Sequence, residues 1–469
     1  MERRGELSKT YVNEYNVRLL VDESRTCPKK SEVFYNEDIT LNRTLITTAL
    51  AVSVERGNSC FGTLRCLDGI GASGVAGLLW KKHVGDNVAV TINDSRGKAY
   101  EGIKHNAELN GLAVKILNRD PCALLHEQTY HFISLDCHVN AAHYLDSAFR
   151  NLPKGGILAI TTTDDAALHA NPDTALKNYG GFIARTFYSK ELAGRLLLAA
   201  MARAAARHNK GMQVLCSVGI KSSFTVIVTV TRGLTHANES VRNIRKLIHC
   251  TMCEDRAFYP VTNYPIDSPT SLLGCGCSRR FPGSVALELG PVWAGSIFSE
   301  EFLVAMHLHS LKFPWKDKAD VLLAQLIAEA RCSYKNENEL LQLQGGSFIG
   351  KHQNETAEER HVKKLKVDDG DKQSVRSGNQ LPVSAVKHDN KPAVTLESDT
   401  EPAPPFYFNL HRHSPKGPKL LRVNTVIQVL RNAGYRASRT HFDREAVRTN
   451  ASLSTLITIL AEAANINVQ

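Results

Sequence analysis

Short apolar runs alternate with helical patterns through the middle of the chain. The runs are rich in Val, Ile and Leu and fall at residues 65–68, 87–92, 115–118, 132–135, 157–161, 214–218 and 224–231. Segments 75–82 and 97–109, which lie between such runs, read as helices, the second with charges along one face. Strands that alternate with helices predict a mostly parallel sheet covered on both faces, which is a Rossmann-like α/β fold.

The pattern changes on either side of this stretch. Residues 1–30 are polar, and we expect them to be flexible. Residues 333–402 are polar and poor in aromatic side chains, which predicts a disordered insert. Ordered patterns resume at residue 403. We therefore predict one domain at 31–235 and a smaller α+β domain formed by 236–332 and 403–469.

Composition and charge narrow the class of protein. The 469 residues are 43% hydrophobic and 22% charged, which is ordinary for globular domains. A net charge of +10 favours a polyanionic partner, nucleic acid before membrane. No apolar run reaches the roughly 18 residues that span a bilayer, and the N-terminus lacks a signal-peptide core. Eleven cysteines, an odd number, indicate a reducing compartment. We expect an intracellular protein of the cytoplasm or the nucleus, nucleolus included, because residues 363–366 resemble a nuclear localisation signal.

A glycine-rich loop is the sharpest local feature. Asp68 ends a predicted strand and is followed by Gly69, Gly71 and Gly74, which satisfy the spacing G-x-G-x-x-G before a helix. Glycines let the backbone approach a ligand closely. Asp94 ends the next strand, where a carboxylate can bind both hydroxyls of a ribose. The loop therefore predicts a nucleotide-type cofactor.

Two further acids separate the possible cofactors. Asp68 directly precedes the loop and would repel a pyrophosphate, whereas it suits the cationic amino group of S-adenosylmethionine. Asp120 follows the third strand and is placed to accept a hydrogen bond from an adenine amino group. We therefore expect S-adenosylmethionine rather than NAD, although an NAD-dependent dehydrogenase stays open as a lower-ranked alternative. The acids could also be loop residues that cap helices.

These residues, with others along the chain, resemble the tRNA guanine-26 N2-dimethyltransferases, most closely the animal dimethyltransferase-like branch. The matching segments include 33–36, 41–43, 93–94, 106–110, 145–148, 161–164, 188–193, 203–207, 289–293, 438–443 and 447–449. The resemblance covers most of residues 30–332 and 403–455. It implies a class I methyltransferase domain with tRNA as the partner. From the sequence we expect no membrane partner, and no obligate protein partner is evident.

The resemblance also implies which residues meet the cofactor. Arg43, Asp94, Asp120 and Pro121 would contact S-adenosylmethionine, while Asp68, Gly69 and Gly71 would shape the pocket. One departure concerns the residue after Arg43: the family has an acid in its Asn-Arg-Asp motif, and here Thr44 stands in that place.

The reaction centre departs further from the family pattern. Members carry an Asp-Pro-Phe-Gly-like loop after the fourth strand, and here the loop reads Asp136-Cys137-His138-Val139. The resemblance implies methyl transfer to the exocyclic amine of a guanine at or near tRNA position 26, with Asp136 accepting a proton or hydrogen bond from the amine. Asp136 could instead cap the following helix, 141–151. A catalytically impaired tRNA-binding homologue is the alternative function.

Four cysteines form two closely spaced pairs in the second unit. Cys250 and Cys253 are separated by two residues, and Cys275 and Cys277 follow after a further 21 residues. Thiolates paired on two turns suit a tetrahedral structural Zn²⁺ with no position open to water. The family resemblance implies the same four ligands, and four free buried thiols are the alternative.

Basic side chains gather in three places that would suit phosphates. The clusters are Arg195, Arg203 and Arg207; Arg279 and Arg280; and residues 411–419 with Arg436, Arg439, Arg444 and Arg448. Tyr407 and Phe442 could pack near bases. We expect these surfaces to contact tRNA.

Overall fold

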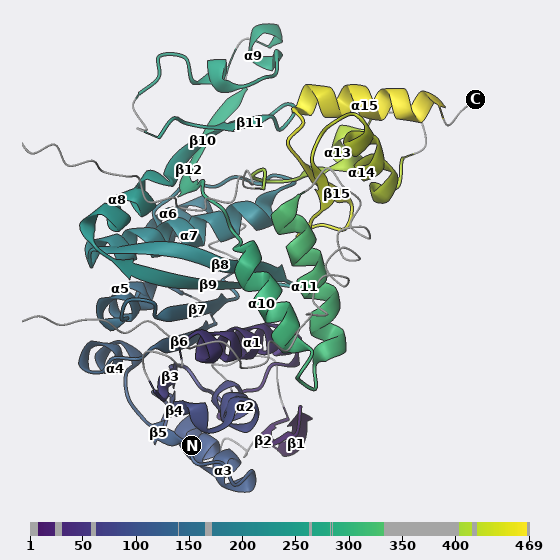
Figure 1. Cartoon of the computed structure of the whole chain (residues 1–469). Helices are drawn as coiled ribbons and strands as arrows, with labels where there is room; N and C mark the ends of the chain where they lie inside the picture. Colours follow the sequence, from purple (N-terminus) through teal and green to yellow (C-terminus); the bar gives the residue numbers. More distant parts are fainter. Residues whose placement is uncertain are drawn as a thin grey trace, which may run out of the picture. The chain divides into compact units, whose positions relative to one another are not determined.

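Figure 1 shows the computed structural model, which describes residues 8–23, 31–57, 62–138, 140–164, 171–261, 265–281, 283, 285–332, 403–414 and 420–466. The expected insert at 333–402, with the lysine-rich run 363–366, lies outside the described residues. So does Val139 of the loop after the fourth strand.

A seven-stranded mixed sheet forms the centre of the fold. Its strands are β3 (Leu64–Asp68), β4 (Val88–Asn93), β5 (Lys115–Leu117), β6 (Phe132–Cys137), β7 (Ile157–Thr162), β8 (Lys210–Ile220) and β9 (Ser223–Arg232). The order is β5-β4-β3-β6-β7-β9-β8. The first five strands in this order are parallel, and β9 runs antiparallel to both β7 and β8. The predicted α/β fold with a mostly parallel sheet is therefore confirmed.

Burial explains the composition of these strands. All six residues of β7, Ile-Leu-Ala-Ile-Thr-Thr, are buried. A parallel strand covered on both faces is selected for continuous apolar and β-branched residues rather than for alternation. The acids Asp68 and Asp136 and the amide Asn93 lie at or next to the carboxyl ends of their strands.

The helices form two groups, and neighbouring helices contact one another within each group. A sheet with both faces covered requires two such groups. One group consists of α1 (Thr40–Gly57), α2 (Val75–Val84), α10 (Glu300–Ser310) and α11 (Lys316–Arg331). The other consists of α4 (Pro121–Glu127), α5 (Ala142–Asn151), α6 (Pro172–Tyr179), α7 (Ser189–Arg207) and α8 (Leu234–Arg242). Helix α3 (Gly97–Leu109) follows β4 and contacts β5. Among the described residues, no helix is both long and apolar enough to cross a membrane.

The N-terminal segment differs from the flexible tail that we expected at residues 1–30. β1 (Lys9–Glu14) and β2 (Val17–Asp22) form an antiparallel hairpin. Val17, Leu19 and Val21 are fully buried, and β2 contacts α2 and α3. Alternate apolar residues on one face of β2 therefore fix this segment to the main core.

The rest of the described chain forms two small three-stranded sheets. β10 (Ile244–Cys250) lies between β11 (Arg256–Phe258) and β12 (Ala286–Trp293). In the C-terminal region, β15 (Ala446–Thr449) lies between β13 (Phe408–Asn409) and β14 (Ala437–Arg439), with α13 (Leu410–His413), α14 (Val423–Asn432) and α15 (Leu453–Ile466). The core around α14 and β15 is separate from the main one.

The predicted domain boundary at residue 235 does not coincide with a separate core. Phe302, Leu303 and Met306 of α10 and Trp315 and Leu323 beyond it belong to the same buried cluster as the central strands. Helices α10 and α11 contact α1. This stretch of the predicted second domain therefore shares the hydrophobic core of the first.

Candidate functional site

Two adjoining cavities lie at the carboxyl ends of the parallel strands. One has a volume of about 40 Å³ and the other of about 400 Å³. The residues that line both are Phe34, Asn36, Ile39, Ile70, Ala72 and Asp136. Ligands of open α/β sheets bind at this end of the strands, so these cavities form the candidate cleft.

The glycine loop packs tightly between β3 and its neighbours. The Gly69 amide donates to the Ser134 carbonyl of β6 at 2.9 Å. A Cβ added to Gly71 would lie 2.6 Å from Ile92 Cγ2 and would clash. Gly74 has φ +81° at the start of α2, a conformation that favours glycine. The spacing of the glycines, recognised in the sequence, therefore reflects real constraints on the loop that lines the cleft.

Asp68, the last residue of β3, directly precedes this loop and lines the smaller cavity. Its Oδ2 accepts a hydrogen bond from the Gly77 amide at 3.0 Å. Burial raises the pKa of Asp68 to about 7, and the negative charges of Asp136 and Asp94 add to this effect. A buried carboxyl with this pKa is ionised most easily when a cation approaches it.

Asp94 lines the larger cavity and is almost fully buried. One of its oxygens accepts from the Ala72 amide of the glycine loop at 2.9 Å. The other accepts from the Arg96 amide, also at 2.9 Å, and from the Arg96 guanidinium at 3.1 Å. Asp94 thus ties the end of β4 to the loop after β3 and presents its carboxylate to the cleft.

Asp120 differs from the other two strand-end acids. It is exposed, and its Oδ1 accepts from the Ala123 amide at 2.9 Å as the N-cap of α4. Pro121 occupies the first turn of that helix. Neither residue is among the described residues that line the two cavities. The helix-capping alternative therefore applies to Asp120.

Asparagines connect the ends of β4 and β5, and we did not single them out as site residues from the sequence. The Asn93 amide group donates to the Gly69 and Arg119 carbonyls, at 3.1 and 3.0 Å. The Asn118 side chain donates to the Asp94 carbonyl at 2.7 Å. Asparagine is depleted in strands, so its presence at the end of a buried strand was a usable signal.

Asp136 lines both cavities near the end of β6. Burial raises its pKa to about 6, while the positive charge of Arg43 acts in the opposite direction. The expected alternative, that Asp136 caps the next helix, is not what the structure shows. The side chain of Asn140 accepts from the Ala142 amide there, at 3.1 Å.

Aromatic rings line the same cleft although the motif lacks a phenylalanine. The larger cavity is bordered by Phe34, His138, His143 and Tyr144. The centroids of the Phe34 and His138 rings are 6.5 Å apart, with an interplanar angle of 54°. The Thr163 hydroxyl donates to the His138 carbonyl at 2.6 Å and so holds the backbone of this loop. A flat base could lie against such a wall.

Arg43 reaches the cleft from α1, but its main partner is an acid that we did not identify from the sequence. Its Nε lies 2.9 Å from Glu14 Oε1, and its Nη2 lies 2.5 Å from Glu14 Oε2. The neighbouring Thr44 hydroxyl donates to the Leu41 carbonyl of its own helix at 2.7 Å. The acid that pairs with Arg43 therefore comes from the N-terminal hairpin rather than from the next residue.

Several arginines predicted to bind phosphate are buried, and that prediction is wrong for them. Arg195 is 2% and Arg448 1% exposed. Arg195 pairs with Glu191, and Arg448 joins Glu191 to Glu329. Arg436 is buried too, as are the rings of Tyr407 and Phe442. A buried guanidinium needs carboxylate and carbonyl partners. The N–H donors that would bind a phosphate therefore already bind these partners.

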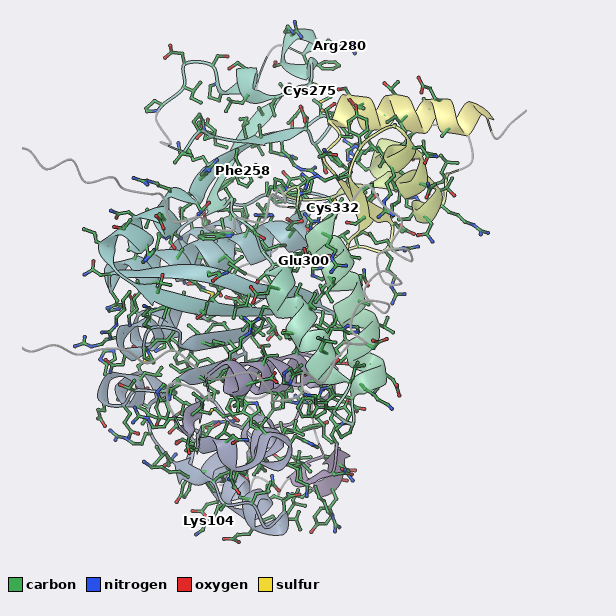
Figure 2. The ribbon with its side chains drawn as sticks, in the orientation of Figure 1. Lys104, Phe258, Cys275, Arg280, Glu300 and Cys332 are labelled. Atoms are coloured by element: carbon green, nitrogen blue, oxygen red, sulfur yellow. The ribbon has the colours of Figure 1, made fainter. Side chains whose placement is uncertain are left out.

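Other basic residues of the predicted clusters remain on the surface. Those exposed are Arg207, Arg279, Arg280, His411, Arg412 and Arg444. Figure 2 shows Arg280 on α9 (Cys277–Arg280), close to the turn that carries Cys275. Arg207 forms an exposed ion pair with Asp146.

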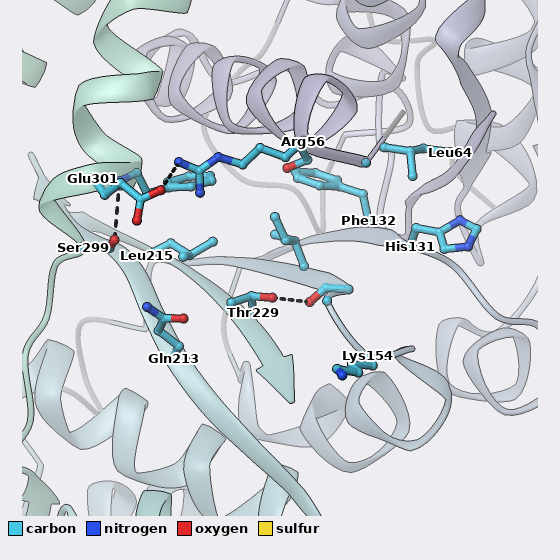
Figure 3. A pocket seen from close by; sticks show the side chains of 16 residues that line it. Arg56, Leu64, His131, Phe132, Lys154, Gln213, Leu215, Thr229, Ser299 and Glu301 are labelled. Carbon is cyan, nitrogen blue, oxygen red and sulfur yellow. Dashed lines mark hydrogen bonds and ion pairs between the residues drawn. The ribbon is translucent and has the colours of Figure 1, made fainter. Parts of the chain in front are cut away.

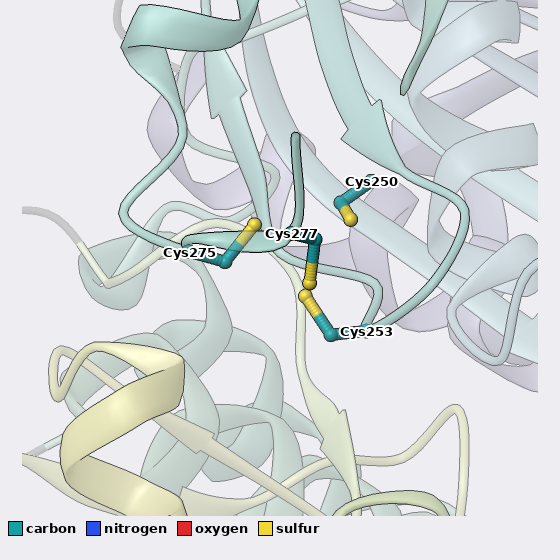
Figure 4. Close-up of side chains that lie close together, drawn as sticks. All are labelled: Cys250, Cys253, Cys275 and Cys277. Atoms are coloured by element: carbon teal, nitrogen blue, oxygen red, sulfur yellow. The ribbon is translucent and has the colours of Figure 1, made fainter. Parts of the chain in front are cut away.

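The four predicted thiol ligands come together at one place (Figure 4). The Sγ atoms of Cys250, Cys253, Cys275 and Cys277 all lie within 4.8 Å of one another. Ligands about 2.3 Å from a tetrahedral Zn²⁺ lie about 3.8 Å apart, so small side-chain movements would complete the site. Asp255 links the two turns, since its carbonyl accepts from the Cys250 amide and its carboxylate from the Cys275 amide, each at 2.8 Å.

A further cavity lies at the opposite ends of the parallel strands (Figure 3). Its volume is about 310 Å³, and Leu64, Phe132 and Ile157, at the starts of β3, β6 and β7, line it. An exposed ion pair between Arg56 and Glu301 borders it. It is remote from the strand ends that carry Asp68 and Asp136.

The chain is similar to proteins of one known family over most of its length. The model of the N2,N2-dimethylguanosine tRNA methyltransferase family matches residues 15–333 and 382–461. The chain belongs to this family. It is 35% identical to a tRNA (guanine(27)-N(2))-dimethyltransferase of Rattus norvegicus over 97% of this chain and 64% of the relative. The human protein of the same name is 36% identical over 96% of this chain and 63% of its own length. The chain thus spans somewhat less than two thirds of these mammalian relatives.

More distant relatives show the extent of the shared fold. A tRNA (guanine(26)-N(2))-dimethyltransferase of Methanosarcina barkeri is 31% identical over 63% of this chain and 75% of the relative. The solved structure of Trm1 from Pyrococcus horikoshii with S-adenosyl-L-methionine has a TM-score of 0.67 and 21% identity, over 96% of this chain and 99% of that one. The predicted resemblance, including its animal branch, is confirmed.

Proposed function

We propose that this protein transfers methyl groups from S-adenosylmethionine to the exocyclic N2 amine of a guanine in tRNA. The observation that carries the proposal is the position of Asp136, half-buried in the shared wall of two cavities at the strand ends of this family's fold. The names of the mammalian and archaeal relatives support the same reaction.

The target within the tRNA is guanine 27. The relatives named for position 27 match 96–97% of the chain, whereas the Methanosarcina barkeri relative named for position 26 matches 63%. This refines the position at or near 26 that the sequence motifs implied.

The cofactor would be held by the loop and acids of the cleft. Asp94 would bind the ribose hydroxyls, and Asp68, with Gly69 and Gly71, would shape the pocket for the methionine end. The fit rests on the cradle at Gly71, which a side chain would fill. Asp120 caps α4 through Oδ1 and lines neither cavity, so an adenine contact from Asp120 or Pro121 would require the cofactor to extend beyond the two cavities. S-adenosylmethionine supplies an electrophilic methyl group on a sulfonium.

Asp136 would act on the amine that receives the methyl. With a pKa of about 6 it is mostly ionised at neutral pH and can accept a hydrogen bond or proton from the guanine amine. The rings of Phe34 and His138 would hold the base beside it. This wall offers a reason why a loop without the family's proline, phenylalanine and glycine can serve the reaction.

Two further parts of the proposal concern the metal and the RNA. The four cysteines would hold a structural Zn²⁺, since four thiolates fill a tetrahedral shell. Exposed Arg279, Arg280 and Arg412 would meet tRNA phosphates. A nuclear or cytoplasmic location stays a prediction.

The test uses purified full-length protein, undermodified tRNA and labelled S-adenosylmethionine, with mass spectrometry of the nucleosides. Dimethylguanosine should form at position 27 and fall by about 10²-fold or more with Asp136→Asn. Asp86→Asn, which alters an exposed carboxylate paired with Lys81, is the matched control. Bound cofactor without any methylation of guanine would reject the proposal.

The impaired homologue makes the opposite prediction. If the loop cannot support catalysis, Cys137→Pro, His138→Phe and Val139→Gly together should create activity where the natural chain has none. Comparable activity before and after this change would favour the enzyme.

A further inference from the structure

A buried ion pair separates the candidate cleft from a neighbouring hollow. Glu14 lines a cavity of about 580 Å³ together with Lys221 and Lys318. Arg43 lines the small cavity of the cleft, and so does Asp136. Tyr35 and Asn36 border both cavities. The Glu14–Arg43 pair therefore forms part of the wall between them.

Hydrogen bonds from neighbouring residues hold the pair in place. The side chains of Arg43 and Glu14 are 6% and 3% exposed. Glu14 also accepts from the Tyr35 hydroxyl at 2.7 Å and from the Thr40 hydroxyl at 3.3 Å. Arg43 Nη2 donates to the Asn36 carbonyl at 3.0 Å. Burial opposes the ionisation of Glu14, but Arg43 and these bonds hold its pKa below the usual value.

Arg43 also acts on the acids of the cleft. Its positive charge lowers the pKa of Asp136 and of Asp68, against the burial that raises both. Other titratable and charged groups line the same two cavities as Asp136. They are Tyr35 before α1, Arg43 on α1, Asp68 on β3, Asp94 and Arg96 after β4, Cys137 on β6, His138 in the following loop, and His143 and Tyr144 on α5.

We propose that Glu14 is a positioning residue of the transfer site, which holds the Arg43 guanidinium in the cleft wall and offsets its charge beside Asp136. The part of this inference that concerns catalysis rests on the proposed function. The electrostatic part does not, because it requires only that Arg43 pairs with Glu14 and lines the same cavity as Asp136.

Loss of the Glu14 charge has a definite consequence. A buried guanidinium without its carboxylate partner is strongly destabilised and seeks another acid. Asp136 lines the same cavity as Arg43, and the charge of Arg43 already acts on it. Arg43 should turn towards Asp136, favour its ionised form and weaken it as an acceptor of protons.

The direct test measures Asp136 itself, without cofactor or tRNA. The full chain is labelled with carbon-13 at the aspartate carboxyl carbons, and Asp136→Asn assigns the Asp136 signal. In Glu14→Gln the titration midpoint of Asp136 should fall by about one pH unit or more. Glu23→Gln, at the other end of the same hairpin, is the matched control and should leave it unchanged. An unchanged midpoint in Glu14→Gln would overturn the proposal.

A double variant keeps the test decisive if Glu14→Gln fails to fold. Glu14→Gln with Arg43→Gln removes both charges and leaves no unpaired buried ion. The Asp136 midpoint should then rise above that of the natural chain, since the charge that lowers it is gone. A midpoint that stays where it was would contradict the coupling.

Turnover supplies the second measurement. In Glu14→Gln the acid limb of the kcat–pH profile should move to lower pH and the plateau should fall about tenfold. Glu14→Asp keeps the charge and should restore most of both. A purely structural residue would lower the folded fraction without moving the limb. If the natural chain does not methylate tRNA, the proposed function fails, while the carboxyl titration still decides the role of Glu14.

Discussion

Two groups of buried arginines and glutamates have different roles in this molecule. Arg43 has one carboxylate partner, Glu14, and lies beside a cavity. Arg448 has two, Glu191 and Glu329, and its donors also meet the carbonyls of Pro404 and Phe406. The first group leaves a charge that acts on Asp136, whereas the second is sealed. Arginine and glutamate thus border the candidate cleft in the first group, whereas in the second they join separate segments of the chain.

The sealed group joins parts of the chain that are far apart in sequence. Glu191 lies on α7, Glu329 on α11 and Arg448 on β15. Glu329 also accepts from the Thr440 hydroxyl at 2.7 Å and pairs with His441. Burial would raise the pKa of Glu329, but the charges of His441 and Arg448 outweigh it and hold the value at about 2.

The largest expected effect on stability comes from breaking the sealed group. Glu329→Gln leaves Arg448 with an incomplete set of buried partners and should lower the free energy of unfolding by about 3–5 kcal/mol. Urea unfolding measures it. Glu301→Gln, which alters an exposed partner of Arg56, is the matched control and should change little. A small effect of Glu329→Gln would show that the two groups are not so different.

The pH dependence of stability should differ in sign between the two cleft acids, Asp68 and Asp136, and Glu329 of the sealed group. The folded chain keeps protons on Asp68 up to a pKa of about 7 and on Asp136 up to about 6, above the usual 3.8. The free energy of unfolding should therefore fall as pH rises from about 4 to 7. Glu329 contributes stability above its usual pKa of 4.5, which is lost as pH falls towards 2.

Urea unfolding at a series of pH values separates the two contributions. Asp68→Asn should flatten the fall between pH 4 and 7 and leave the acid limb in place. An unaltered slope would mean that Asp68 ionises normally in the folded chain.

The smallest effect should come from an arginine whose carboxylate partner is exposed. Arg207 and Asp146 are each 56% exposed along their side chains and lie 2.7 Å apart. Arg207→Ala should lower the free energy of unfolding by less than about 1 kcal/mol, because water screens the pair. Thermal or urea unfolding would show it. A loss comparable to that of Glu329→Gln would refute the assignment of stability to burial.

The sequence by itself determined the features that depend on neighbouring residues. The strands, the glycine loop with Asp68 and Asp94, and the paired cysteines could all be predicted, because backbone conformation and short spacing carry them. The alternation of Val17, Leu19 and Val21 was visible in the same way, but the surrounding polar residues led us to expect a flexible segment.

Only the tertiary structure decided how each charged residue is used. Arg43 meets Glu14 from 29 positions away, and Arg448 meets Glu191 from 257 positions away. Asp120 caps helix α4, whereas Asp136 lines the larger cavity of the cleft. Local sequence fixes the direction of a strand or helix, but the partner and solvent exposure of a charge depend on which distant segment packs against it.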